Sequence, residues 1–224
     1  MIRATLILLT AAAAAAAAAV ALVATGCGVR FSDGPHTAQT RPIGAFDRVE
    51  LRGSANLVVH RGSGNTLTVA GGKTRVDEVT TRVQAGTLIV AEHDSSDVLD
   101  VGGDHLTVTV TTPKLDAVTL DGSGDVSLPE LRGGPLRVRI DGSGDVDGHG
   151  RLDALDAAVD GSGDIAMEDV KIQSARVEVS GSGNADVHAV RTLDAIVSGS
   201  GDIGYDGDPT VSRDISGSGD VSHN

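Results

Sequence analysis

The sequence predicts an all-β fold, a parallel β-helix (β-solenoid) with about 18–20 residues per coil, and three observations lead to this prediction. The second half of the chain repeats one tetrapeptide, Gly-Ser-Gly-Asp or once Gly-Ser-Gly-Asn, at residues 122–125, 142–145, 161–164, 181–184, 199–202 and 217–220. The starts of these copies are 20, 19, 20, 18 and 18 residues apart, which is too short for a domain with its own core but suits one turn of a solenoid. Two phenylalanines and one tyrosine are the only aromatic residues, so Val, Ile, Leu and Ala must fill a narrow interior.

The residues on either side of each tetrapeptide predict two strands per coil. Before the tetrapeptide, apolar and polar residues alternate, as in Leu136, Val138 and Ile140, which is typical of a strand with one buried face. A second short strand is expected to begin with Val126, Val146, Ile165, Ala185, Ile203 or Val221. One coil is therefore expected to contain a strand, the Gly-Ser-Gly-Asp corner, a second strand and a variable corner. Equivalent strands of successive coils would lie parallel, about 4.8 Å apart.

Residues 46–113 are also β-rich but lack the regular period, in contrast to the repeats at residues 114–224. We expect strands at residues 49–51, 56–59, 66–69, 87–91 and 105–111, and a polar loop at residues 94–103. This portion is expected to cap the stack and to form one domain with the repeats, over residues 46–224.

Three short glycine-containing segments in this portion receive separate interpretations. Gly-Ser-Ala-Asn at residues 53–56 is interpreted as a decayed copy of the corner. Gly-Ser-Gly-Asn at residues 62–65 matches the tetrapeptide but is out of phase with it, and is interpreted as a hairpin turn. Gly-Gly-Lys-Thr at residues 71–74 lacks the first glycine of a phosphate-binding loop and is interpreted as a β-turn.

The N-terminus predicts export and lipidation. Residues 1–26 are predicted to be a signal peptide, with a positive charge at Arg3 followed by an apolar, alanine-rich run. The sequence Ala-Thr-Gly-Cys, ending at Cys27, resembles a bacterial lipobox, in which the cysteine is acylated and holds the protein on the outer face of a membrane. An ordinary secretory signal with a chance cysteine, or an uncleaved membrane anchor, is the alternative. Residues 27–45 are expected to be the lipidated cysteine and a flexible, polar tether.

The charge and cysteine content limit the classes of partner and of stabilising bond. The chain has 18 Lys and Arg against 31 Asp and Glu, a formal net charge of -13. An acidic surface argues against binding of nucleic acid or of anionic lipid, and it is compatible with cations or basic partners. Because Cys27 is the single cysteine, no internal disulfide is expected, and stability must come from packing and backbone pairing.

The repeated corner has a structural interpretation. Glycine permits positive φ and close approach of neighbouring backbones, while Asp or Asn can accept hydrogen bonds from backbone N–H groups and fix the turn. The glycines with this role are Gly122, Gly124, Gly142, Gly144, Gly161, Gly163, Gly181, Gly183, Gly199, Gly201, Gly217 and Gly219.

The same corner has a functional interpretation as a calcium-binding ladder, because carboxylates are the ligands that calcium prefers. The ladder would contain Asp125, Asp145, Asp164, Asp202 and Asp220 on one edge, with Asp121, Asp141 and Asp160 on the other side of the first three corners. Neighbouring unit charges about 4.8 Å apart in water repel by roughly 0.9 kcal/mol. Asn184 interrupts the row, so three adjacent pairs cost about 3 kcal/mol, which the fold can tolerate without a metal.

No motif in the sequence predicts catalysis. No serine stands in a Gly-x-Ser-x-Gly nucleophile elbow, and the seven histidines show no metal-ligand spacing. We therefore expect a protein that is not an enzyme and that uses no cofactor, calcium excepted.

The opening segment Phe46-Asp-Arg-Val-Glu-Leu-Arg-Gly-Ser-Ala-Asn-Leu-Val-Val59 and the Leu-x-Ala-Val-x-Leu-x-Gly-Ser-Gly-Asp repeats that follow it resemble the bacterial head GIN domain family, whose members are described as auto-transporter adhesins. The resemblance covers residues 46–224. It implies a right-handed β-helical domain at the cell surface with an adhesive role, and it implies no catalytic residues.

Three hypotheses on function follow. The first is a lipid-anchored surface solenoid that binds or adheres to an unidentified ligand or protein. The second is a calcium-binding solenoid that uses the aspartate ladder. The third is a structural envelope protein that self-associates end to end, because the sequence predicts no capping helix or polar strand after the last corner, so that unpaired backbone groups would be exposed there.

Overall fold

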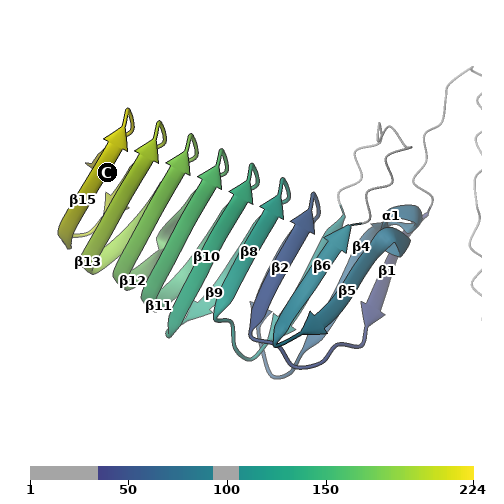
Figure 1. The fold of residues 1–224 in the computed structure, drawn as a ribbon. Helices are drawn as coiled ribbons and strands as arrows, with labels where there is room; N and C mark the ends of the chain where they lie inside the picture. The colour runs from purple at the N-terminus through teal and green to yellow at the C-terminus, as the bar shows by residue number, and fades with distance from the viewer. Residues whose placement is uncertain (1–34, 93–105) are drawn as a thin grey trace, which may run out of the picture. The chain divides into compact units, whose positions relative to one another are not determined.

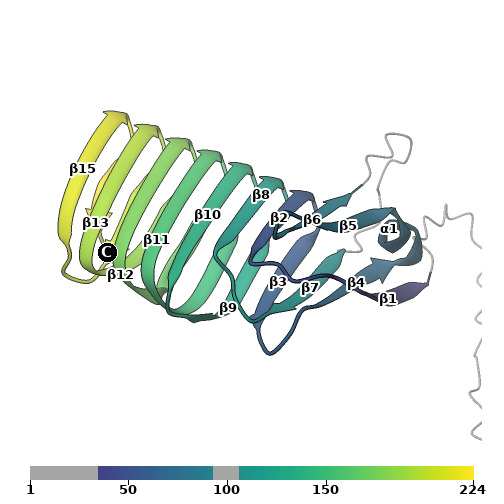
Figure 2. The ribbon, with the colours of Figure 1, turned by 60° about the horizontal axis from the view of Figure 1, so that its bottom comes forward.

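The computed structural model describes residues 35–92 and 106–224, and within them sixteen strands join into one hydrogen-bonded sheet that curls around an apolar core (Figures 1 and 2). The C-terminal half is a β-solenoid of about five turns, and a curled mixed sheet precedes it. The predicted all-β solenoid is therefore confirmed. No helix in these two ranges is long and apolar enough to cross a membrane.

Two walls enclose the core. The first wall contains, in spatial order, β5 (Val79–Gln84), β6 (Thr87–Glu92), β2 (Arg48–Gly53), β8 (Ala117–Gly122), β10 (Pro135–Gly142), the C-terminal halves of β11 (Val146–Gly161), β12 (Ile165–Gly181) and β13 (Ala185–Gly199), and β15 (Thr210–Gly217). The second wall contains β1 (His36–Arg41), β4 (Thr66–Gly72), β7 (Thr107–Thr112), β3 (Asn56–Arg61), β9 (Val126–Arg132), the N-terminal halves of β11, β12 and β13, then β14 (Ile203–Asp206) and β16 (Val221–His223).

The repeats determine the register of the first wall. The first glycine of each corner pairs with the first glycine of the next, from Gly122 and Gly142 onward, and all these strands are parallel. Gly53 pairs with Gly122 in the same register, so the segment interpreted as a decayed corner is indeed the corner of the coil formed by β2 and β3. The loops at the arrow tips in Figure 1 are these corners.

The second bend of the coil differs from the expectation. The sequence predicts a variable corner between coils, but β11, β12 and β13 run through this bend without interruption. Shifts of register between Asp147 and Gly150, and between Met167 and Lys171, accommodate the bend as β-bulges. A distinct corner lies here only where glycine and proline separate two strands, as at Gly133 and Gly134 between β9 and β10.

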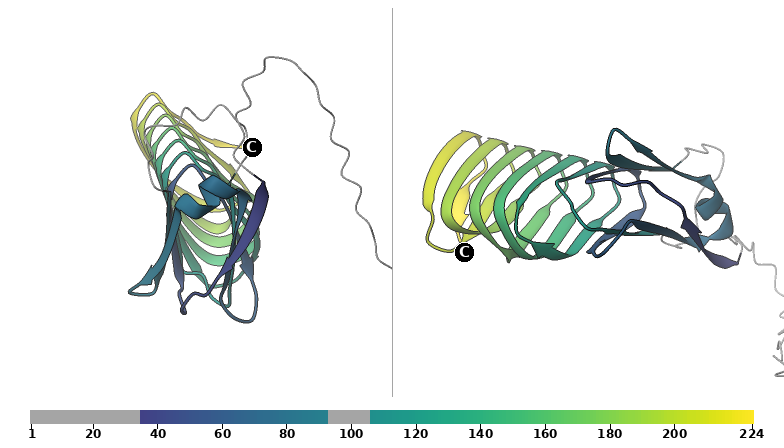
Figure 3. Two further views of the ribbon diagram at one scale, coloured as in Figure 1. Left: turned by 90° about the vertical axis from the view of Figure 1, so that its right-hand side faces the viewer. Right: turned by 90° about the horizontal axis from the view of Figure 1, so that it is seen from below.

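In the N-terminal portion, the order along the chain differs from the order in space. β6 stacks in parallel on β2 and β7 stacks in parallel on β3, although both strands come later in the chain. Together β6 and β7 form one more coil. It lies beside β2 and β3, on the side opposite β8 and β9. Beyond them β5, β4 and β1 pair antiparallel, and the six-residue helix α1 (Lys73–Glu78) lies at the same end (Figure 3).

Three expectations for this portion are wrong. Residues 62–65 are not a hairpin turn, because β7 lies between β3 and β4 and pairs with both. Residues 71–74 are not a β-turn, because β4 ends at Gly72 and α1 begins at Lys73. The expected tether contains β1, which has few apolar residues and is held by its backbone pairing to β4 and by Arg41, which donates to the carbonyl oxygens of Val76 and Val79.

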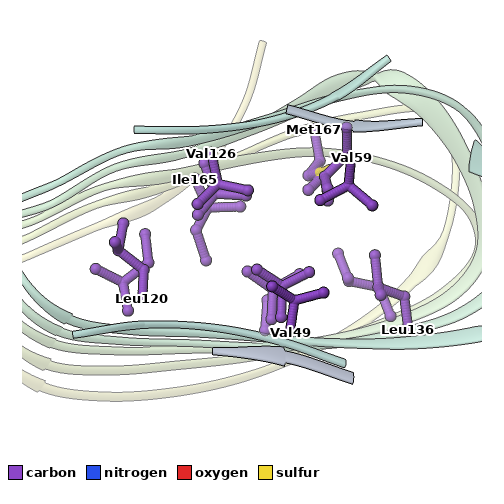
Figure 4. Packing of buried hydrophobic residues seen from close by; sticks show 14 of the residues in the cluster. Val49, Val59, Leu120, Val126, Leu136, Ile165 and Met167 are labelled. Atoms are coloured by element: carbon purple, nitrogen blue, oxygen red, sulfur yellow. The ribbon is translucent and has the colours of Figure 1, made fainter. Parts of the chain in front are cut away.

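Aliphatic rows fill the interior, since each inward position repeats on the next coil. One such row runs along the first wall through Val49, Val118, Val138, Ala157, Val177 and Ala195, which are all at most 1% exposed. Figure 4 shows Val49 on one wall facing Val126 and Ile165 on the other. Burying one such valine or isoleucine contributes roughly 1.5–3 kcal/mol to the stability of the fold. The stability of the core is therefore the sum of similar contributions from successive coils.

Several expectations concern residues outside the described ranges. These are the signal peptide at residues 1–26, lipidation of Cys27, the first part of the tether and the polar loop at residues 94–103.

Candidate functional site

The Gly-Ser-Gly-Asp corners align into a ridge along one edge of the solenoid, which we call the corner ridge (residues 53–56 and the six tetrapeptides). The first glycine of each tetrapeptide has a φ of 129° to 144°, a range that side chains with a Cβ rarely adopt. The serine side chains are exposed, and the second glycines are buried except for Gly219 on the last coil, which is partly exposed. The ridge therefore presents one hydroxyl per coil to solvent.

The second glycine of each of the six tetrapeptides is required by the spacing of the coils. A Cβ on Gly144 would lie 1.9 Å from the carbonyl oxygen of Gly124 on the preceding coil. The same contact would be 1.8 Å for Gly201 against Gly183. Because the atom in the way is backbone, the coils would have to separate to admit any side chain.

Backbone hydrogen bonds connect the corners. The N–H group of Ser143 donates to the carbonyl oxygen of Gly122 at 2.9 Å, and the equivalent bonds along the ridge measure 2.8–3.0 Å. At the first corner no earlier glycine is present to accept this bond. The carboxylate of Glu92, at the end of β6, accepts it instead, with Ser54 N–H 2.8 Å from Glu92 Oε1. Arg75 contacts the other oxygen of this carboxylate at 3.3 Å.

The structure brings the first predicted row of aspartates together, with Asn184 among them. The side-chain oxygen of each member except the last, Asp220, accepts a hydrogen bond from the backbone N–H of the next member, on the adjacent coil. These distances are 2.9 Å from Asp164 N to Asp145 Oδ1 and 2.8 Å from Asp220 N to Asp202 Oδ1. This geometry is the turn-fixing role of the structural interpretation.

The second predicted row lies on the first wall, immediately before the corners. Asp121, Asp141 and Asp160 are neighbours in register and all three are exposed. Arg139 lies 3.9 Å from Asp160 across one coil. Within residues 35–92 and 106–224, no three His, Cys, Asp or Glu side chains lie close enough together to hold a metal ion.

A groove of about 600 Å³ runs along the second wall beside the aspartate row. Its acidic lining includes Asp147 and Asp186, which the sequence analysis does not identify because they lie outside the tetrapeptide. The Ser127 hydroxyl donates to Asp147 Oδ2 at 3.0 Å, and the Asn224 amide lies 3.3 Å from Asp186 Oδ1. The sequence does contain a signal for Asp147 and Asp186, because each directly follows the buried residue that begins the strand after the corner.

A row of alternating charge crosses the first wall. Arg137 pairs with Asp156 at 2.9 Å, and Arg176 pairs with Asp194, each pair joining adjacent coils. These side chains are largely exposed, so each pair contributes little to stability. In these pairs the opposite charges of neighbouring coils offset one another.

The groove contains groups suited to binding. Its lining combines carboxylates, amides and a hydroxyl with the apolar residues Val146, Ile165 and Ala166, and no histidine, lysine or cysteine is among the lining residues. Such a surface offers hydrogen-bond acceptors and negative charge to a partner.

Residues 45–209 match the family model described as "Putative auto-transporter adhesin, head GIN domain". The chain belongs to this family. The resemblance stated from the sequence is thereby confirmed, and the family description assigns the head GIN domain no catalytic role.

Solved structures share the fold of this chain. One is described as a putative adhesin from Bacteroides fragilis, with 20% identity and a TM-score of 0.67 over 85% of this chain and 97% of that one. Another, from Parabacteroides distasonis, is described as a putative lipid binding protein, with 23% identity and a TM-score of 0.54 over 86% of this chain and 98% of that one. No curated protein matches the sequence. At these identities the likeness establishes the fold alone.

Proposed function

We propose that this head GIN domain protein is a non-catalytic, lipid-anchored binding protein of the bacterial cell surface that acts as an adhesin. The observation that carries this proposal is the corner ridge, because it presents the same exposed serine and acidic groups on successive coils of a regular scaffold. Membership of a family described as adhesins supports the binding role. The lipobox-like sequence ending at Cys27 supports the anchor.

Repetition favours a partner that itself repeats. A single exposed carboxylate or hydroxyl binds weakly in water, but several engaged at once on one scaffold raise the overall affinity without any new kind of contact. The ridge and the groove supply acceptors and negative charge, so the best-suited partner is a polymer or surface with repeated cationic groups.

Attachment of cells tests the binding role. Cells that display the full-length protein are expected to attach to surfaces coated with a lysine-rich polypeptide, and attachment should fall at high salt. The double variant Asp147→Asn with Asp186→Asn, which removes two groove charges, should attach less. Glu168→Gln is the matched control, because Glu168 is exposed on β12 outside the groove. Attachment no greater than that of cells without the protein would refute the proposal.

The anchor is tested separately at Cys27. The variant Cys27→Ser should lose incorporation of labelled fatty acid, and the protein should move from the membrane fraction to the soluble fraction. Because several acyl chains hold a protein on a membrane much more strongly than one, a nearly complete shift is expected. Equal labelling of Cys27→Ser and the parent protein would contradict lipidation at this residue.

A further inference from the structure

On the first wall, the inward row that begins at Val49 is no longer apolar at the last coil. Six coils place valine or alanine at this position, the last of them Ala195, which is fully buried. On β15 the residue in register with Ala195 is Arg213. The next coil of the core would therefore have to pack against a guanidinium group in place of an aliphatic side chain.

The inward row of the second wall changes at the same place. Val187 on β13 is in register with Tyr205 on β14, and Tyr205 with His223 on β16. Buried apolar packing thus continues to Tyr205, which is 7% exposed, and is followed by an exposed histidine. These two rows, one on each wall, end in polar side chains beside the Tyr205 ring, whereas the neighbouring inward rows continue with Val211, Ile215 and Val221.

Arg213 and His223 both contact Tyr205 at this end of the core. Arg213 Nη2 donates to the Tyr205 hydroxyl at 2.9 Å, and the guanidinium carbon lies 5.7 Å from the centre of the tyrosine ring. The His223 ring meets the Tyr205 ring edge-on, with centres 5.1 Å apart, and its Nε2 is 2.8 Å from the carbonyl oxygen of Gly207. The sole tyrosine of the chain therefore covers the interior where the rows that end in Arg213 and His223 lose their apolar side chains.

The strands at this end are nevertheless open to pairing. β15 pairs with β13 and β16 pairs with β14, and neither has a second neighbour among the described strands. Ile215 on β15 is 43% exposed. Exposed strands of this kind pair readily with other chains unless charge directed toward the interior makes such packing unfavourable.

We propose that Arg213, with Tyr205 and His223, forms a cap that ends the solenoid and prevents a second chain from stacking on it. A chain that paired with β15 would remove from water the Arg213 guanidinium, which forms no ion pair with a described carboxylate, and burying an unpaired charge opposes such pairing. The end is then a closed surface, in contrast to the end-to-end association that the sequence leaves open. This inference is independent of the proposed adhesive role.

Sedimentation velocity of the full-length chain, in a detergent that keeps any acyl chain soluble, tests the cap. The parent protein should sediment as one species at all concentrations. Arg213→Val should restore an apolar row and open the end, so the average mass should rise about twofold with concentration as dimers form. Arg82→Val is the matched control, because Arg82 is an exposed arginine on β5, the edge strand at the opposite end. This control should remain a single species.

Two results would overturn the cap. One is a parent protein whose mass rises with concentration, and the other is a folded Arg213→Val variant that stays a single species. If Arg213→Val does not fold, as judged by circular dichroism, Arg213→Gln keeps the length of the side chain and removes its charge, and the same criteria apply to it. Protection of the β15 amides from hydrogen exchange in the associating variant would place the new contact at this edge.

Discussion

The regular coils from β8 to β16 and the segment from β1 to β7 contribute to the same two walls, but their contacts arise differently. In the regular coils each residue lies beside its equivalent one repeat later, so Gly142 meets Gly122 and Asp164 meets Asp145. In the N-terminal segment β6 and β7 fold back to stack beyond β2 and β3, and the corner bond is supplied by one side chain, Glu92. In the regular coils, the contacts are therefore set by neighbouring repeats in the sequence. In the N-terminal segment, they are set by individual residues that lie far apart in the sequence.

The largest effect should come from a side chain placed inside the regular stack. Gly144→Ala should destabilise the protein by about 3 kcal/mol, because its Cβ would lie 1.9 Å from a backbone oxygen that cannot move alone. Gly44→Ala is the matched control in the N-terminal segment, where no atom lies within 4 Å of the added carbon. Urea unfolding measures both. Equal stabilities of the two variants would contradict the close-packed ridge.

The second-largest effect should come from Glu92, which accepts the corner hydrogen bond that a glycine of the preceding coil accepts elsewhere. Glu92→Ala should cost about 2 kcal/mol, because it leaves the Ser54 N–H without its acceptor and removes the contact between Glu92 and Arg75. Glu92→Gln retains an acceptor oxygen and should cost about half as much. Thermal unfolding of the three proteins gives the order. A Gln variant as unstable as the Ala variant would mean that the charge, and not the hydrogen bond, matters here.

A smaller effect is expected when the aspartate row is made uninterrupted. Asn184→Asp replaces an amide that donates to Asp164 Oδ1 at 3.0 Å with a carboxylate between Asp164 and Asp202. The variant should lose about 1 kcal/mol at low salt and less at high salt. Unfolding at two ionic strengths, with and without calcium, measures this. Calcium is expected to leave the stability of both proteins unchanged, since the row already accepts backbone hydrogen bonds. If calcium restored the stability lost by Asn184→Asp, the calcium-binding interpretation would be supported.

The smallest effect should be a pH dependence in the N-terminal segment. The hydrogen bond from Lys73, and then that from Gln39, holds the pKa of Asp77 below its ordinary value of 3.8. Because the folded state favours the carboxylate, this stabilisation is present above that ordinary pKa and is lost as the pH falls through the lowered one. Asp77→Asn should therefore narrow the difference in melting temperature between neutral and acidic pH. An NMR titration of Asp77 that shows an ordinary pKa would contradict this.

The solenoid could be predicted because its signals are local and repeated. Each tetrapeptide and its flanking alternation predicts one corner and two strands, and the next copy predicts the partner. β1 could not be predicted in this way, since its binding to β4 depends on backbone pairing and on Arg41, not on an apolar pattern. The prediction of a hairpin turn at residues 62–65 is wrong for a related reason. β7, which comes much later in the sequence, lies between β3 and β4 and pairs with both.

The candidate site was predictable to the same extent. The aspartates of the ridge follow from the repeat, and the structure places them in the expected row. Asp147 and Asp186 lie one residue after the first buried position of their strands, where no tetrapeptide marks them. Glu92 was missed because its function depends on being one coil away from Ser54, a proximity that no sequence spacing indicates.

The hydrogen bonds of the corner ridge also have an electrical consequence. Each Gly–Ser peptide unit donates through its N–H to the preceding coil and accepts through its carbonyl from the next, so these units align head to tail from Ser54 to Gly217. A peptide unit has a dipole of about 3.5 D, and aligned units polarise one another. The neighbouring Asp–Val units point the opposite way, as in the bond from Val126 N–H to the Asp145 carbonyl, so the two rows of dipoles offset one another at a distance. Their fields act at the ends of the ridge, and at the positive end of the Gly–Ser row the carboxylate of Glu92 supplies the opposing charge.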